Sequence, residues 1–154
     1  MTGRTENILI DDVTEMGYAA MRAPASGARS SHYAGDVWIA DRIVTEAPDW
    51  IERQTIVTTK LWIVEEKYKS DTNKRHIFEY ADKIDKMIEL SESIGATPLM
   101  AVRWSNRCEW SPGPTHLIAD AREIERTDSG NLSISPDDTE SDTFGPTCDF
   151  FSED

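Results

Sequence analysis

The sequence has few of the residues that would indicate a secreted, metal-finger or membrane protein. Two cysteines, Cys108 and Cys148, are too far apart for a metal motif or a disulfide framework. The three histidines, His32, His76 and His116, also lack metal-site spacing. No apolar run approaches the roughly 20 residues that cross a bilayer, and the N-terminus has no hydrophobic stretch of the signal-peptide kind. We therefore expect a cytoplasmic protein with reduced thiols and no membrane partner.

Positive charge is also scarce, since the net charge of the 154 residues is −13. The excess is uneven: residues 127–154 carry eight acids and no Lys or Arg, whereas residues 1–126 carry 21 acids and 16 bases. Proteins that bind nucleic acids contact the phosphates with Lys and Arg, so a net negative charge on residues 1–126 argues against such binding unless the negative charge has another origin. One possible origin is a halophilic host. Its salt-rich cytoplasm favours acidic protein surfaces and screens the repulsion between such a surface and phosphates. The alternative is a mildly acidic protein with a local basic patch.

Hydrophobic periodicity predicts one domain over residues 1–126 and an acidic, disordered tail over 127–154. The order helix, strand, strand, strand, helix, strand predicts an α/β protein with a small mixed β-sheet flanked by helices. The segment of about 42–60 has a Pro48 turn and a β-prone stretch, which suggests an added hairpin. The predicted helices cover 6–16 and 71–94, and the predicted strands cover 18–21, 36–40, 61–68 and 97–104, with weaker candidates at 54–59 and 115–121.

The strongest strand, 61–68, contains the most informative chemistry. Alternate side chains of a strand share a face, so Ile63, Glu65 and Lys67 point one way and Glu66 points the other. A carboxylate and an ammonium at the end of a buried strand need partners, and a divalent metal is one solution. Mg²⁺ takes one or two carboxylates, and Asp36 at the start of a preceding strand could supply the second. The alternative is an exposed edge-strand pair, the usual origin of an isolated Glu-x-Lys.

An Asp followed, after a variable gap, by Glu-x-Lys on an apolar strand resembles the signature of the PD-(D/E)xK nuclease superfamily. More narrowly, residues from about Gly3 to Trp104 resemble the archaeal Holliday junction resolvases. The shared segments include Met16 to Gly27, Val64 to Lys67 and Ser91 to Trp104. The Arg-Ala-Pro-Ala-Ser-Gly loop within the first segment is the most specific element. The resemblance implies a restriction-endonuclease-like nuclease core.

Matched position by position, the resemblance implies that Asp36, Glu65 and Glu6 bind metal and that Lys67 and Ser26 complete the catalytic centre. It further implies a Mg²⁺-dependent homodimer, with Mn²⁺ as a substitute. Each subunit would cut one of two opposed strands of a four-way junction during recombination and repair, leaving 5′-phosphate and 3′-hydroxyl ends. Both residues also have a purely structural interpretation. Glu6 could be an acid favoured by the helix dipole, and Ser26 could cap a turn.

Two departures from the family pattern concern the turn before Asp36 and the gap after it. Gly35 stands where the family usually has Pro, and Gly permits a turn without presetting it. Asp36 and Glu65 are 29 residues apart, which is longer than the family pattern and reflects the added segment. Neither departure removes a catalytic group.

Six cations directly follow the strand 61–68 or lie in segments expected to meet its end. We expect them to bind the DNA backbone, although each alone could be an ordinary surface charge. They are Arg4, Arg22, Arg29, Lys69, Lys74 and Arg75. Paired cuts in a two-fold symmetric junction favour a C2 dimer. Phe150 and Phe151 in the acidic tail suggest an anchor for a partner such as a sliding clamp, although the usual upstream Gln and aliphatic residue are missing. The alternative is a solubilising tail.

Two other functions stay open from the sequence. The first is another PD-(D/E)xK nuclease, of repair or restriction type, that acts on duplex or flap DNA. The second is a non-catalytic, junction-binding relative. Retention of Asp36, Glu65 and Lys67 together argues against the second.

Overall fold

The computed structural model describes nine segments of the chain: residues 2–23, 35–41, 43–45, 55–57, 60–69, 76–78, 81–104, 116–134 and 144–151. A six-stranded sheet in the order β1-β2-β5-β7-β8-β10 forms its centre. These strands cover Ala19–Arg22, Val37–Ala40, Leu61–Lys69, Thr97–Trp104, Leu117–Asp120 and Gly145–Pro146. Only the β5–β7 pair is parallel, and the other pairings in this sheet are antiparallel.

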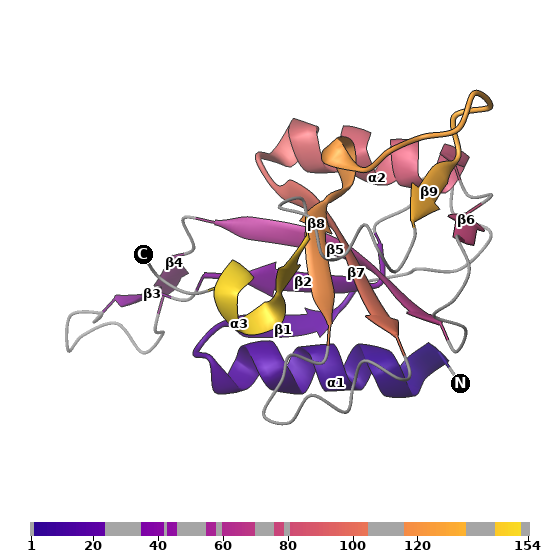
Figure 1. Ribbon diagram of the computed structural model, residues 1–154. Helices are drawn as coiled ribbons and strands as arrows, with labels where there is room; N and C mark the ends of the chain where they lie inside the picture. The colour runs from indigo at the N-terminus through magenta and orange to yellow at the C-terminus, as the bar shows by residue number, and fades with distance from the viewer. Residues whose placement is uncertain are drawn as a thin grey trace.

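Two long helices lie on opposite faces of the sheet (Figure 1). Helix α1 spans Thr2–Glu15 and helix α2 spans Ala81–Ile94. Helix α2 belongs to the crossover that makes β5 and β7 parallel, because parallel neighbours need a long connection. In the described parts of the chain, no helix combines the length and apolar character needed to span a membrane.

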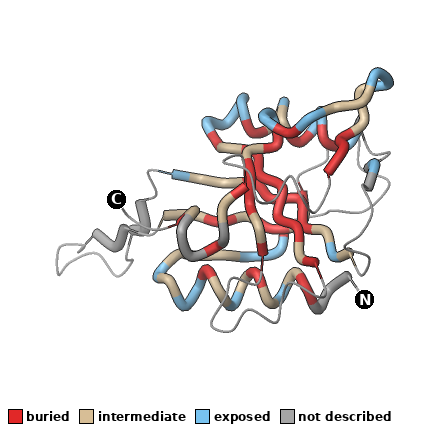
Figure 2. Tube along the Cα trace, in the orientation of Figure 1, coloured by how far each residue is buried: buried red, intermediate tan, exposed pale blue. Residues whose placement is uncertain are grey.

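Each helix buries an apolar stripe against its own face of the sheet. Leu9 and Val13 of α1 pack with Val64 of β5, whereas Ile84 and Met87 of α2 pack on the opposite face. Burial is densest in the central strands (Figure 2). Full burial of an aliphatic side chain contributes about 1.5–3 kcal/mol, so these two stripes fix both helices over the middle of β5.

The predicted strands are confirmed to within two residues at their ends, but the second helix is shorter than expected. Residues 76–78 form strand β6 (His76–Phe78), which pairs with β9 (Leu132–Ile134), and the helix begins only at Ala81. Ile77 fits the helical period yet is 53% exposed. A short β-prone run with a partner strand can override such a pattern. The first helix begins at Thr2, four residues before its predicted start.

The C-terminal part of the chain differs from the disordered tail that the composition suggested. Residues 127–134 and 144–151 are part of the packed structure, and the latter form β10 and helix α3 (Thr147–Phe150). Phe144 and Phe151 are buried in the two separate cores. The ring of Phe151 meets Tyr18 and Trp62 edge to face. Four apolar side chains of this region, including Leu132 and Ile134, are buried. The acidic and small residues around them gave the segment the composition of a disordered tail.

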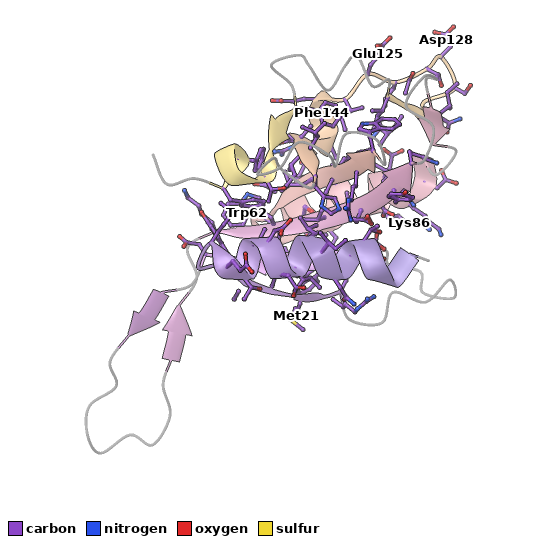
Figure 3. The ribbon with its side chains drawn as sticks, turned by 60° about the horizontal axis from the view of Figure 1, so that its bottom comes forward. Met21, Trp62, Lys86, Glu125, Asp128 and Phe144 are labelled. Carbon is purple, nitrogen blue, oxygen red and sulfur yellow. The ribbon has the colours of Figure 1, made fainter. Side chains whose placement is uncertain are left out.

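Between β2 and β5 the chain forms a separate two-stranded antiparallel pair, where the sequence suggested a hairpin. Strands β3 (Ile43–Thr45) and β4 (Thr55–Val57) pair with each other in antiparallel register. The main-chain nitrogen of Asp41 donates to the carbonyl of Lys60 at 3.0 Å, which closes the base of the segment. Figure 3 shows the β3–β4 pair projecting away from the body of the molecule.

Candidate active site

Strand β5 places a carboxylate and an ammonium together on one face, as the alternation of its side chains predicts. Lys67 Nζ lies 3.1 Å from Glu65 Oε1. The Glu65 side chain is 5% exposed and the Lys67 side chain is 25% exposed. The carboxylate is therefore nearly enclosed, whereas part of the lysine side chain is open to solvent.

Asp36 lies against the same stretch of β5, although 29 residues separate it from Glu65. Val37 pairs with Val64 in the β2–β5 register, so the residue before β2 falls beside Glu65. The Asp36 nitrogen donates to the Val64 carbonyl at 2.8 Å. Asp36 Oδ2 accepts from the main-chain nitrogen of Glu66 at 2.9 Å. Main chain and side chain together thus fix the Asp36 carboxylate at the edge of β5.

Gly35 explains how the chain enters this position. Its φ of 73° lies in the left-handed region, which glycine adopts readily and proline cannot reach. A Cβ atom here would lie 2.9 Å from both Ile63 Cγ2 and the Val64 carbonyl oxygen. Gly35 is therefore not a looser replacement for the family's Pro, as the sequence suggested, because the backbone at this position requires glycine.

Glu6 reaches the site from the first turns of α1. Its Oε2 accepts from Arg22 Nη1 at 2.6 Å, and Arg22 Nη2 donates to Asn7 at 2.9 Å. Burial is the main cause that raises the pKa of Glu6, and Asp36 acts in the same direction, as does Glu66. The cations Arg22 and Lys67 oppose the rise. Glu6 therefore shares the electrostatic environment of the β5 residues.

Behind these groups, on the α1 side of the sheet, lies a buried polar cluster that the sequence analysis missed. Glu66 Oε2 accepts from Thr5 Oγ1 at 3.0 Å, and Glu66 Oε1 lies 3.4 Å from His116 Nε2. The side chains of Glu66 and His116 are 2% and 0% exposed. The available signal was the alternation of β5, which turns Glu66 into an apolar core where a carboxylate needs partners.

The remaining predicted residues divide into those the structure places and those it does not describe. Lys69 ends β5, and burial followed by repulsion from Lys67 lowers its pKa. Arg4 lies in the first turn of α1. The other four, Ser26, Arg29, Lys74 and Arg75, lie outside the described residues.

The donor set at β5 fits a hard divalent cation. Within the described segments, no group of three or more His, Cys, Asp or Glu side chains is arranged around a common ion position. Mg²⁺ does not require such a group, since it usually takes one or two carboxylates together with water and phosphate oxygens. Asp36 and Glu65 supply two carboxylates from adjacent strand positions.

Comparison with known proteins identifies a protein family and similar solved structures. The family model described as archaeal Holliday junction resolvase (hjc) matches residues 3–143. The crystal structure of Hjc from Archaeoglobus fulgidus, a Holliday junction resolvase from an archaeal hyperthermophile, is similar with a TM-score of 0.60 and 16% identity. The match covers 86% of this chain and 87% of that one. A search of the curated proteins found no significant match.

These findings confirm the expected fold class, a mixed sheet flanked by helices with a restriction-endonuclease-like core. At 16% identity the structural likeness establishes the fold alone. The family model carries the stronger statement because it spans well over half of the sequence. This chain therefore belongs to the archaeal Holliday junction resolvase family.

Proposed function

We propose that the protein is a metal-dependent endonuclease that resolves four-way DNA junctions in the cytoplasm by paired, symmetric nicks. The observation that carries the proposal is the hydrogen bond that holds Asp36 against β5, one residue from the Glu65–Lys67 pair. This contact joins the dispersed acid of the PD-(D/E)xK signature to its Glu-x-Lys element. Membership of a resolvase family supports junction DNA as the substrate.

Asp36 and Glu65 are the residues that would hold Mg²⁺, or Mn²⁺ in its place. The family resemblance implies Glu6 as a third ligand, and Asp36 is one of the charges that raise the pKa of Glu6. When bound, the ion would supply Lewis-acid chemistry at a phosphate oxygen and favour ionisation of the attacking water. The near-complete enclosure of Glu65 keeps its carboxylate ordered for this purpose.

Lys67 would orient the attacking water and stabilise negative charge as the scissile phosphate becomes pentacovalent. Glu65 holds its ammonium at 3.1 Å, and one quarter of the Lys67 side chain remains exposed. A cation that is fixed by an enclosed carboxylate but open on its other side is suited to stabilising developing charge. Hydrolysis would leave 5′-phosphate and 3′-hydroxyl ends.

Arg22 and Lys69 are the described cations best placed to contact the phosphates that flank the cut. Arg22 is half exposed and adjoins Glu6, and Lys69 follows Lys67 by two residues on β5. Arg4, Arg29, Lys74, Arg75 and the loop residue Ser26 complete the proposed DNA-contacting set. Backbone contacts of this kind position a protein by the shape of the DNA rather than by base sequence.

A homodimer with C2 symmetry would bring two such sites to opposed strands of one junction. A sliding-clamp contact through Phe150 and Phe151 is less well supported, because Phe151 is 2% exposed and packs on Tyr18 and Trp62. A partner could bind that ring only if the C-terminal segment left the body of the protein. The burial of Phe151 therefore argues against a clamp contact through this segment.

One cleavage assay tests the proposal against its alternatives. The purified protein is incubated in high salt with Mg²⁺ and with matched four-way, flap and linear DNAs. Symmetric nicks in the four-way DNA alone support the proposal. Binding of the four-way DNA without any cut would indicate a non-catalytic relative.

A nuclease of the same superfamily with another substrate is the second candidate. The β3–β4 pair favours it, because this added element lies between the two acidic positions in sequence and projects from the body (Figure 3). Cleavage of flap or linear DNA at rates equal to those on the four-way DNA would support this candidate instead.

A further inference from the structure

Glu66 occupies the variable position of the Glu-x-Lys signature, yet it is among the least exposed charged residues that the structure describes. Its side chain has two polar partners that come from different parts of the chain. Thr5 belongs to α1, and His116 immediately precedes β8. A carboxylate buried in an apolar core is costly without such partners, so the three groups are expected to keep one arrangement. The three elements meet on the α1 side of the sheet (Figure 1).

The two residues that would hold the metal, and the further candidate Glu6, each adjoin this cluster in sequence or contact it. Glu65 is the preceding residue on β5. Asp36 is held by the main-chain nitrogen of Glu66 itself, at 2.9 Å. Glu6 follows Thr5 on α1, so the bond from Thr5 Oγ1 to Glu66 fixes the turn of helix that carries Glu6.

The cluster is anchored on its far side by the C-terminal segment. The carbonyl of His116 accepts from the main-chain nitrogen of Thr147 at 3.2 Å and from its hydroxyl at 3.1 Å. Thr147 is 3% exposed and is the first residue of helix α3. Phe151, which directly follows this helix, is buried in the core on the α1 side of the sheet. The imidazole that contacts Glu66 is therefore held from both its ring and its main chain.

We propose that Glu66, together with Thr5 and His116, is a positioning cluster that sets the positions of the Asp36 and Glu65 carboxylates and so tunes the affinity of the site for its metal. Glu66 is too enclosed to touch DNA, so it acts only through its neighbours. The inference rests on the proposed function, because it concerns the geometry of the same site. Removing the partners that orient metal ligands typically costs 10- to 100-fold in metal affinity or activity.

The sharpest test compares Thr5→Val with Thr5→Ser. Valine keeps the shape of the side chain and removes the hydroxyl, whereas serine keeps the hydroxyl. The matched control is Thr14→Val, an exposed position on the same helix. We measure binding of Mn²⁺ to the full-length protein by electron paramagnetic resonance, and the Mg²⁺ dependence of junction cleavage under single-turnover conditions.

We expect Thr5→Val to weaken Mn²⁺ binding about tenfold and to shift the Mg²⁺ dependence equally. Thr5→Ser and Thr14→Val should stay within about twofold of the unmodified protein. Junction affinity, measured in Ca²⁺ to prevent cleavage, should not change in any of them. Glu66→Leu should show the larger loss and Glu66→Gln a smaller one, because Gln retains an acceptor for the Thr5 hydroxyl.

Unaltered Mn²⁺ affinity in Thr5→Val would overturn the inference, even if that variant were less stable to heat. If Glu66→Leu does not fold, the Thr5 pair still decides the question. Failure of the proposed function gives a different result, since the unmodified protein would then leave four-way DNA uncut. If the unmodified protein cuts four-way DNA and the variants bind Mn²⁺ equally well, only the positioning role is refuted.

Discussion

Asp36 Oδ2 accepts a hydrogen bond from the main-chain nitrogen of Glu66 at 2.9 Å, so the acid at the start of β2 is fastened directly to the strand that carries Glu65 and Lys67. The contact uses only one oxygen of Asp36 and the backbone of Glu66. It would therefore survive a change of charge at position 36 that preserved an oxygen acceptor. This property separates the structural role of Asp36 from its proposed chemical role.

Asp36→Asn should retain the fold and lose the metal. The Asn side-chain oxygen can still accept from the Glu66 nitrogen, but a neutral amide is a weaker ligand for a hard divalent cation. We expect an unchanged urea midpoint without metal, loss of measurable Mn²⁺ binding, and loss of junction cleavage. A variant that still bound Mn²⁺ normally would remove Asp36 from the metal site.

Lys67→Ala should reduce junction cleavage by about 10²- to 10⁴-fold, the range for a lost charge-stabilising or proton-transferring group. Binding of four-way DNA should fall only slightly, because one of several phosphate-facing cations is lost. The matched control is Lys60→Ala, an exposed lysine next to the opposite end of β5. Normal cleavage by the Lys67 variant would show that its assigned role is wrong.

Gly35→Ala should destabilise the protein more than Gly130→Ala. Both glycines have left-handed φ angles, 73° and 88°, so both substitutions cost about 1–3 kcal/mol in backbone strain. Only at Gly35 would the new methyl group meet another residue's backbone, at 2.9 Å, because nothing lies within 4 Å at Gly130. Urea denaturation of both variants at one salt concentration measures the difference. Equal losses would show that the turn before Asp36 is not tightly packed.

Glu6→Gln should become progressively more stable than the unmodified protein as the pH rises, provided that metal is removed. The raised pKa of Glu6 means that the folded protein favours the protonated carboxyl. The stabilisation from this group is therefore complete below its ordinary pKa near 4.5 and is lost as the pH rises through the raised value. Urea denaturation in EDTA, between about pH 4 and pH 7, gives the trend. If the stability of Glu6→Gln relative to the unmodified protein fell as the pH rose, the prediction would be wrong.

Phe151→Ala should destabilise the protein by about 3–5 kcal/mol, the usual cost of removing a buried aromatic ring. The ring is 2% exposed and packs on Tyr18 and Trp62, whereas the neighbouring Phe150 is only half-buried. Phe150→Ala is thus the matched comparison and should cost less. Equal, negligible effects in thermal unfolding would instead favour a tail that is free to bind a partner.

The sequence predicted the central strands well because their signal is local. An uninterrupted apolar run marks β7, and an apolar run ending in charges marks β5, so both boundaries follow from composition. The same alternation placed Glu65 and Lys67 on one face. Asp36 was a candidate for the second carboxylate because it starts a preceding strand, and the family resemblance supported that choice. No local pattern reports which strands become neighbours.

The rest depended on contacts between distant segments. The partner strand of β6 lies more than 50 residues further along the chain. No local pattern indicated this pairing, so the helical period alone placed Ile77 in the predicted helix. Phe151 was predicted to lie in an acidic tail because the residues that its ring contacts, Tyr18 and Trp62, are remote in sequence. The pairing of Glu66 with His116 was hidden for the same reason, across 50 positions.

The closed base of the β3–β4 segment bears on how resolvases of this kind can diversify. Since Asp41 and Lys60 are already hydrogen-bonded neighbours, the chain leaves the sheet and returns at the same place. The entropy of such an excursion grows only logarithmically with its length. A change in the length of this segment would therefore leave the register of β2 and β5, and with it the positions of Asp36 and Glu65, unchanged.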